Sequence, residues 1–356
     1  KFPMKKSLIT LAVLSFAGAA SAQSSVTLYG VADLFFGQME KGASGKQLKQ
    51  TVVDTDGLSS SRWGFKGAED LGGGLKANFV LEGGMKMDTG EQKTAGSIFD
   101  RVATVGLSGT FGAVTLGRQA TPYDALRAST NNTYDSKALT ATDIVWGKDK
   151  NYSEVAAYES RLSNSIAFTS ANYSGFSGAV AVNFGENKGR GLNNVSVDAG
   201  QAVSLNAQYA SGPLLVGVAY QEQKTQNAAT TAASTGTVST QYTLIAGSYD
   251  FGLAKLTAGY NTAKADAPNA KDKQYQVGVT VPFSKAASVA FGYAKGDGEI
   301  AGKDGKNGSG YSLVGVYDLS KRTTLYAGWM DTQAKNAAGA ETYKNSAVAI
   351  GVRHKF

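Results

Sequence analysis

The sequence predicts an all-β protein: a transmembrane, antiparallel, up-and-down β-barrel of about 16 strands around a water-filled lumen. Three observations carry this prediction. Apolar and polar residues alternate with period two along most of the chain, short turns alternate with long polar connections, and the strand pattern continues to the last residue, Phe356. Period-two alternation is typical of strands with one apolar and one wet face.

The composition agrees with long strands joined by tight turns. The 356 residues include 44 Gly, 17 Tyr and 15 Phe, but only 5 Pro and no Cys. Without cysteine there is no disulfide framework. Beyond the N-terminal segment no apolar run is long enough for a transmembrane helix, so strands are the elements that could cross a membrane.

The N-terminal residues are typical of a bacterial export signal. Lys5 and Lys6 precede the apolar run LITLAVLSFAGAA, which is too short to span a bilayer. The run leads into Ala20-Ser21-Ala22, a small-x-small cleavage pattern. We therefore expect a signal peptide with upstream residues over 1–22, which is removed, and a single β-barrel domain over 23–356.

The net charge is mildly basic. Removing Lys1, Lys5 and Lys6 takes away no acidic residue, so 35 − 3 = 32 basic residues face 28 acidic ones, and the charge falls from +7 to +4. So small an excess, in an exported chain, argues against nucleic acid as a partner.

The strand pattern can be followed residue by residue. In the segment 203–209 every odd residue is apolar or aromatic and every even residue is polar. The predicted strands begin near Val26, Ser61, Leu75, Phe99, Ala113, Arg161, Gly178, Ala202, Leu214, Thr240, Ala254, Gln274, Ala287, Tyr311, Thr323 and Asn345.

The connections between these segments are of two kinds. Short turns rich in Gly, Ser and Asp lie at 70–74, 109–112, 174–178, 211–213, 251–253 and 319–322. Long polar stretches, which we expect to be loops, lie at 42–57, 223–239, 261–273, 295–310 and 331–344. Short turns at one end and long loops at the other are typical of an outer-membrane barrel.

The polar faces decide between a barrel and a soluble sandwich. They are rich in Gly, Ser, Asn and Gln and carry charges, and a ring of about 16 strands cannot be filled by such side chains, so it holds water. Only a closed barrel satisfies every backbone group in lipid. The last strand must then pair with the first, around SSVTLYGVADLFF, and Phe356 shares the outward parity of Val352.

These residues carry a family likeness. The chain resembles the general diffusion porins of the β-proteobacterial outer membrane, of the neisserial type in the broad sense. The matching stretches are SSVTLYGVADLF, SRWGFKGAEDLGGGLKANFVLEGG, FDRVATVGLSGTFGAVTLGRQ, SRLSNSIAFTSANYSGFSG and the closing GVRHKF.

The resemblance implies more than the periodicity does. It implies a homotrimer, with a third long loop folded into each pore, surrounded by lipid and lipopolysaccharide and passing small hydrophilic solutes. It also implies that the barrel-assembly machinery reads Phe356. The third loop, from about Gln119 to Tyr158, lacks the Pro-Glu-Phe-Gly signature of enterobacterial relatives, so its inward path rests on its length and position.

A diffusion pore acts through its radius and its electrostatic field. Parity points Arg62 inward, opposite Trp63, and Lys66 shares that parity. Arg161 opposes Leu162, whereas the parity of Arg101 is less clean. The resemblance places Arg62, Arg101 and Arg161 on the pore wall. Lys76, Asn78 and Glu82 share the inward parity of their strand, and Arg118 has outward parity.

Facing carboxylates are expected from the third loop, and the candidates are Asp124, Asp135, Asp143, Asp149 and Glu154. Three positive charges about 6 Å from an anion attract it by about 2 kcal/mol in water, which salt reduces to about 1 kcal/mol. The sequence therefore predicts a weak anion preference.

Other classes of protein have less support in the sequence. An enzyme with a histidine base has only His354 to use, near the end of the last strand, and no metal-binding or cofactor-binding motif occurs. We expect no enzyme activity, no cofactor and no metal. A channel specific for a sugar, phosphate or peptide would share the fold. An adhesin with a vestigial pore would need its loops to bind.

Overall fold

The computed structural model describes residues 25–134, 136–142, 150–190, 196–226 and 237–356, and the expected signal peptide lies outside them. These residues form one antiparallel sheet of 17 strands. The strands are β1 (Ser25–Ala43), β2 (Leu48–Thr55), β3 (Arg62–Gly72), β4 (Leu75–Gly84), β5 (Val102–Gly109), β6 (Gly112–Ala120), β7 (Arg161–Ser170), β8 (Phe176–Arg190), β9 (Ser196–Ser211), β10 (Leu214–Gln226), β11 (Thr237–Asp250), β12 (Lys255–Ala265), β13 (Ala270–Pro282), β14 (Ala287–Ile300), β15 (Lys303–Asp318), β16 (Thr323–Lys335) and β17 (Glu341–Lys355).

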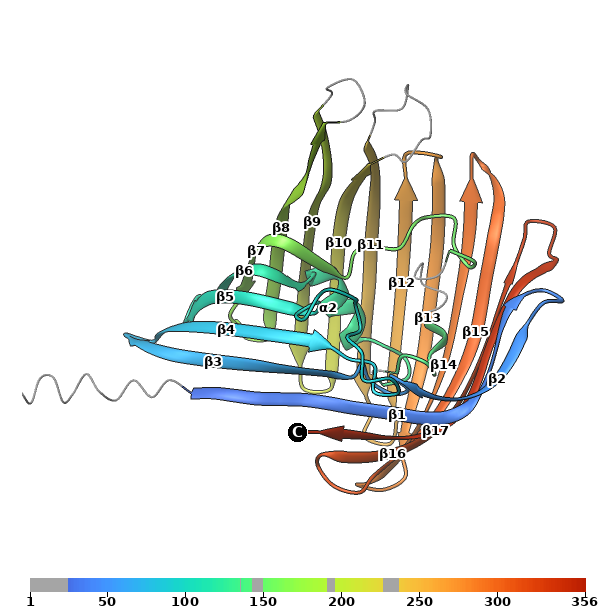
Figure 1. The fold of residues 1–356 in the computed structure, drawn as a ribbon, viewed down its shortest axis with the longest axis horizontal. Coiled ribbons are helices and arrows are strands. Elements are labelled where there is room, and N and C mark those ends of the chain that lie inside the picture. Colours follow the sequence, from blue (N-terminus) through green and yellow to red (C-terminus); the bar gives the residue numbers. More distant parts are fainter. Residues whose placement is uncertain (1–24, 135, 143–149, 191–195, 227–236) are drawn as a thin grey trace, which may run out of the picture.

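The sheet closes on itself, as the sequence predicts (Figure 1). Strand β17 pairs with β1 from Val31↔Lys355 to Ala43↔Tyr343. Beyond the first of these pairs, Gly30 N donates to Phe356 O at 2.9 Å and Phe356 N donates to Gly30 O at 3.1 Å. A Cβ atom on Gly30 would lie 2.3 Å from Phe356 Cζ, so the phenylalanine ring covers this glycine at the seam.

Strands β2 and β3 together occupy one position in the barrel. Both pair with β1: β2 along Leu34–Lys41 and β3 along Ser25–Val31. They are two halves of a single interrupted strand, so 17 strands fill 17 − 1 = 16 positions. The sequence prediction of about sixteen strands is confirmed.

The prediction that residues 42–57 form a polar loop is wrong, because β2 lies within them. Its outward residues, those that share the facing of Phe36 on β1, include Lys49 and Thr51. Val53 is the only apolar residue among the outward positions 49, 51 and 53, so the alternation is lost although the backbone still pairs. The strand expected from Phe99 begins at Val102.

Three more of the expected loops are largely strand. The stretches 261–273, 295–310 and 331–344 fall mostly within β12 to β17, and only Ala301 and Gly302 separate β14 from β15. Strand ends beyond the apolar band have water on both faces, so their sequences lack period-two alternation. Such sequences cannot be distinguished from polar loops by their pattern.

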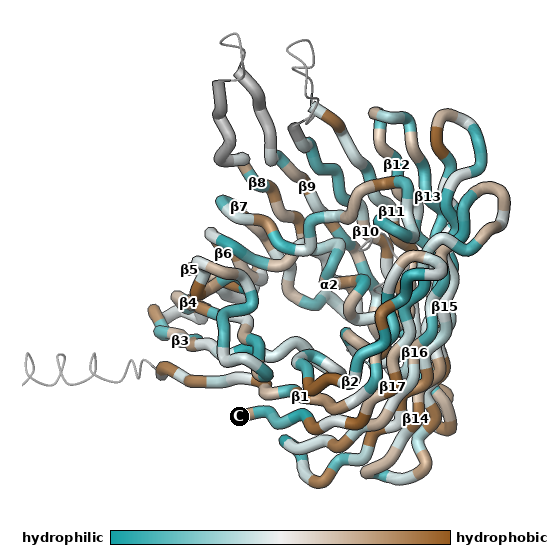
Figure 2. Tube along the Cα trace, turned by 45° about the vertical axis from the view of Figure 1, so that its right-hand side comes forward, coloured by the Kyte–Doolittle hydropathy of each residue, from teal (hydrophilic) through white to brown (hydrophobic). Residues whose placement is uncertain are grey.

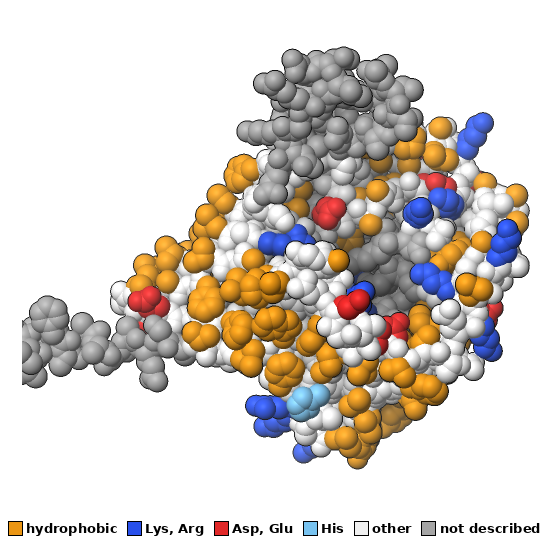
Figure 3. Space-filling model, in the orientation of Figure 1, with side chains coloured by type: hydrophobic (Ala, Val, Ile, Leu, Met, Phe, Trp, Pro, Cys, Tyr) orange, Lys and Arg blue, Asp and Glu red, His pale blue; other side chains and the backbone are white. Residues whose placement is uncertain are grey.

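The two faces of the sheet differ as predicted. On β13, Tyr275 and Val277 are exposed outward, whereas the inward Gln274 and Gln276 are each 1 % exposed. Figure 2 shows hydrophobic and hydrophilic residues alternating along the strands, and Figure 3 shows hydrophobic side chains gathered over the wall formed by β1 to β6. The outer face is therefore an apolar band, and the inner face is polar.

The connection between β6 and β7 is the third loop, and its described residues, 121–134, 136–142 and 150–160, fold into the barrel. It begins with the helix α2 (Pro122–Ser129), capped by Thr121, whose side chain accepts a hydrogen bond from Asp124 N at 3.1 Å. Proline at the first helical position suits this cap. No helix in the described ranges is long and apolar enough to cross a membrane.

Apolar side chains hold α2 against the barrel wall. Tyr123 and Leu126 are fully buried and pack with Tyr158, Tyr242 and Leu244 in one cluster. The helix contacts β8, β9, β10 and β11. The infolded third loop expected from the family resemblance is therefore present.

Glycines on the inner wall make room for the next part of the loop. A Cβ atom on Gly278 would lie 2.5 Å from Asn132 Cβ, and one on Gly292 would lie 2.6 Å from Asn132 Cγ. Asn132 Nδ2 donates to Val277 O at 3.4 Å and Tyr293 O at 3.3 Å. These glycines serve close approach rather than turn formation.

Candidate pore constriction

The third loop packs against the inner wall on the side of β8 to β17 and against Phe35 and Val52 on β1 and β2. The wall from β3 to β7 lies on the other side of the lumen. On that wall Arg62 and Glu82 lie on the neighbouring strands β3 and β4, with Arg62 beside Gly84 and Gly64 beside Glu82. Alternation then turns both side chains inward. The Arg62 Nε atom lies 3.6 Å from Glu82 Oε2.

Glu82 also accepts two hydrogen bonds. Arg101 Nε donates to Glu82 Oε1 at 2.6 Å, and Tyr29 OH donates to Glu82 Oε2 at 3.0 Å. The Arg101 and Glu82 side chains are 18 % and 11 % exposed. Two arginines thus share one carboxylate on the same wall.

Arg101 reaches the lumen because it stands just outside its strand. β5 begins at Val102, so strand alternation does not fix the facing of Arg101. Its backbone N donates to Glu82 O at 3.2 Å, which brings its side chain beside Glu82.

Arg161 begins β7 on the same side of the lumen. It lies within electrostatic range of Arg101, Glu82, Asp124 and Arg118. Its Nε atom is buried and has no hydrogen-bond partner among the described residues.

A register shift between Gly117 and Gln119 lies beside Arg161 and involves Arg118. Arg118, which sequence parity turns outward, donates from Nε to Asp100 O at 2.6 Å and from Nη1 to Ser163 Oγ at 2.9 Å. These bonds hold its guanidinium between the connection that precedes β5 and the start of β7.

Lys66 adds a further positive charge to this wall, four residues beyond Arg62 on the same strand, β3. It shares the facing of Arg62 on β3, and its Nζ atom lies 5.1 Å from the centre of the Tyr29 ring. Its side chain is exposed. This wall therefore carries the carboxylate of Glu82 and four basic side chains, those of Arg62, Arg101, Arg161 and Lys66.

The acidic candidates of the third loop take different positions. Asp124 Oδ1 accepts from Tyr158 OH at 2.8 Å and lies 3.4 Å from Arg127 Nε, within range of the Arg161 charge. Glu154 lies on the far wall, where Oε1 accepts from Lys306 N at 2.9 Å. The other three candidates, Asp135, Asp143 and Asp149, lie outside the described residues.

Sequence reasoning placed Glu82 inward but did not pair it with the arginines. It also missed two buried carboxylates, Asp33 on β1 and Asp272 on β13, which accept hydrogen bonds from backbone N–H groups of segments inside the lumen. A signal was available for Asp33, because it interrupts the apolar run VADLFF, and a buried carboxylate needs partners. Within the described ranges no group of three or more potential metal ligands occurs.

The architecture defines a class of protein. A closed barrel with an apolar outer band, a polar lumen, an infolded loop and a basic wall opposite that loop is a pore-forming membrane protein. The chain belongs to the Gram-negative porin family, whose model matches residues 9–337. This family membership places the chain in the outer membrane and confirms the resemblance seen in the sequence.

Sequence similarity to known porins extends over nearly the whole chain. Outer membrane porin protein 32 of Delftia acidovorans is 34 % identical, and an outer membrane porin protein of Bordetella pertussis is 32 % identical; each match covers 99 % of this chain and 100 % of the relative. The solved anion-selective porin from Comamonas acidovorans is 29 % identical, with a TM-score of 0.76 over 94 % of this chain and 100 % of that one.

Proposed function

We propose that the barrel is a general diffusion channel, which passes ions and small hydrophilic solutes through the outer membrane and weakly prefers anions. One observation carries the proposal: three arginines lie together on one wall of the lumen, where Arg62 and Arg101 pair with Glu82 and Arg161 lies within electrostatic range of that carboxylate. The charge of that group is 3 − 1 = +2.

The size of the preference follows from this charge. Two net positive charges about 6 Å from a passing anion attract it by about 1.4 kcal/mol in water, and physiological salt reduces this to about 0.7 kcal/mol. That energy corresponds to an anion preference of about threefold. The solved porin from Comamonas acidovorans, described as anion-selective, supports the same sign.

The test is a reversal-potential measurement in planar bilayers under a salt gradient. The wild type should prefer anions about threefold. The double variant Arg62→Ala plus Arg161→Ala leaves Arg101 and Glu82, whose charges cancel, so its permeability ratio should fall to about one. A cation-selective wild type, or a double variant with unchanged selectivity, would refute this account.

Liposome swelling separates a general pore from a specific one. With sugars of increasing size, a general pore should give rates that fall smoothly with solute mass. A single sugar passing faster than smaller ones would instead favour a substrate-specific channel. Open conductance also distinguishes a working pore from an adhesin with a vestigial one.

The remaining expectations are part of this proposal. The channel performs no bond chemistry: His354, the sole histidine, is exposed, and its Nδ1 atom lies 2.9 Å from Thr323 Oγ1. We propose a homotrimer in lipid and lipopolysaccharide, assembled through recognition of Phe356. A heat-sensitive oligomer band on a gel would support the trimer, and chemical cross-linking to species no larger than a dimer would oppose it.

A further inference from the structure

The segment Asp56–Ser61, which we call the wall insert, interrupts the strand formed by β2 and β3. Five of its six residues are buried, although it lies in a polar stretch of the sequence. Asp56 has a positive φ of 68°, which turns the chain out of the strand. The insert therefore leaves the wall and enters the lumen.

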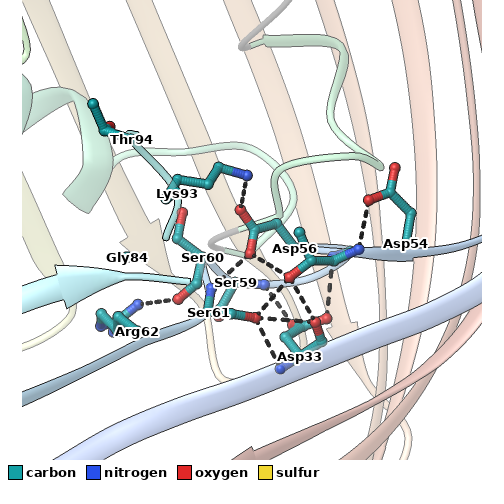
Figure 4. A network of polar contacts seen from close by, with 12 residues as sticks. Asp33, Asp54, Asp56, Ser59, Ser60, Ser61, Arg62, Gly84, Lys93 and Thr94 are labelled. Atoms are coloured by element: carbon teal, nitrogen blue, oxygen red, sulfur yellow. Dashed lines mark hydrogen bonds and ion pairs between the residues drawn. The ribbon is translucent and has the colours of Figure 1, made fainter. Parts of the chain in front are cut away.

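Asp33 holds the wall insert from below (Figure 4). Its carboxylate accepts hydrogen bonds from three successive backbone N–H groups: Gly57 at 3.1 Å, Leu58 at 3.1 Å and Ser59 at 2.7 Å. Tyr326 OH donates a fourth at 2.6 Å. Asp33 is 0 % exposed, so these donors replace the water that an ionised carboxylate requires.

The upper side of the wall insert carries the third loop. Lys137 N donates to Gly57 O at 3.2 Å, and Ala138 N donates to Asp56 O at 3.1 Å. Ser136 Oγ donates to Gly57 O at 3.1 Å. Leu58 and Leu139 lie in one apolar cluster with Phe35, Tyr326 and Met330, so packing adds to these hydrogen bonds.

The opposite end of the wall insert holds a pore arginine. Arg62 Nη1 donates to Ser60 O at 2.8 Å. The connection between β4 and β5 also reaches the insert, because Lys93 Nζ lies 2.7 Å from Asp56 Oδ2 (Figure 4). One short segment thus joins the third loop to the arginine wall.

We infer that Asp33 is a positioning residue for permeation: by holding the wall insert in the lumen, it fixes the separation between the third loop and Arg62 and so sets the width of the constriction. The inference rests on the proposed channel function. Asp33 is buried beneath the insert and does not face permeating ions. Its effect is therefore on geometry rather than on the local field.

The first variant is Asp33→Asn in the full-length protein, recorded as single channels in planar bilayers. The amide has one acceptor oxygen, and its NH₂ group would face backbone N–H donors, so the insert should detach. We expect the mean conductance to change by about half or more, with several conductance levels in place of one, because conductance follows pore cross-section. Heat-modifiable migration on a gel should show that the barrel remains closed.

Two further variants keep the test decisive if Asp33→Asn does not fold. Tyr326→Phe removes one donor to Asp33 and keeps the aromatic ring, and Gly57→Ala adds a Cβ atom that would lie 2.0 Å from Tyr326 Oη. Both should shift conductance in the same direction as Asp33→Asn. Asp331→Asn is the matched control, because Asp331 lies on β16 and its carboxylate is 3.5 Å from Lys344 Nζ on β17, outside the insert.

Folded variants with wild-type conductance and selectivity would overturn the inference and leave Asp33 a structural residue only. A wild type that forms no channels would instead overturn the proposed function. The two failures are therefore distinguishable.

Discussion

Arg101 Nε donates to Glu82 Oε1 at 2.6 Å, so the positive wall of the constriction carries its own counter-charge. The pair joins the strand β4 to a residue just before β5, and Arg62 shares the same carboxylate. In the proposed channel we therefore expect the selectivity to depend on a difference between opposite charges on one wall, which single substitutions should shift in either direction.

Glu82→Gln should strengthen the anion preference. Loss of one negative charge raises the net charge of the group from +2 to +3, which adds about 0.3 kcal/mol in salt and raises the anion-to-cation permeability ratio about 1.5- to 2-fold. Reversal potentials measure the change. The matched control is Glu69→Gln, since Glu69 faces outward on β3 and should leave the ratio unchanged. A lower ratio for Glu82→Gln would contradict the shared-carboxylate account.

Gly278→Val should displace the third loop while the barrel stays intact. The new side chain would occupy the place of Asn132, whose Cβ would lie 2.5 Å from the added Cβ atom. We expect an altered conductance with unchanged heat-modifiable migration. Gly315→Ala is the control, because its Cβ atom would meet nothing closer than 3.6 Å. Wild-type conductance in a folded Gly278→Val protein would show that the position of the third loop does not depend on the close contact between Gly278 and Asn132.

The packing of α2 against the barrel wall should be sensitive to alkaline pH, because Tyr123 is buried there. Burial raises the pKa of Tyr123 above its ordinary value of 10, because its hydroxyl is enclosed and cannot be solvated when ionised. In the neutral form this hydroxyl donates a hydrogen bond to Asn261 Oδ1. The folded state thus favours the neutral phenol. Its contribution to stability is complete below pH 10 and is lost as the pH rises toward the folded pKa.

Conductance recorded across this alkaline range should therefore change reversibly in the wild type, and Tyr123→Phe should reduce the change because no phenol ionises at that site. Tyr173→Phe, at an exposed position, is the control and should behave as the wild type does. An equal alkaline response in Tyr123→Phe would assign the effect to other groups.

The sequence by itself determined the barrel. Alternation in segments such as 203–209 identified the outward and inward faces, because a strand that separates lipid from water must place its side chains alternately. The same rule turned Arg62, Lys66 and Glu82 inward, and the number of alternating segments matched the sixteen positions. Strand parity and the family likeness predicted basic residues on the pore wall.

Only the tertiary structure decided which side chains meet. The pairing of Glu82 with Arg101, the division of one strand into β2 and β3, and the capture of the wall insert by Asp33 all depend on register and on contacts between distant segments. Alternation acts within one strand and says nothing about its neighbour. Where water wets both faces, or where a chain leaves the sheet, the solvent no longer imposes a pattern, and long-range packing and hydrogen bonding alone fix the structure.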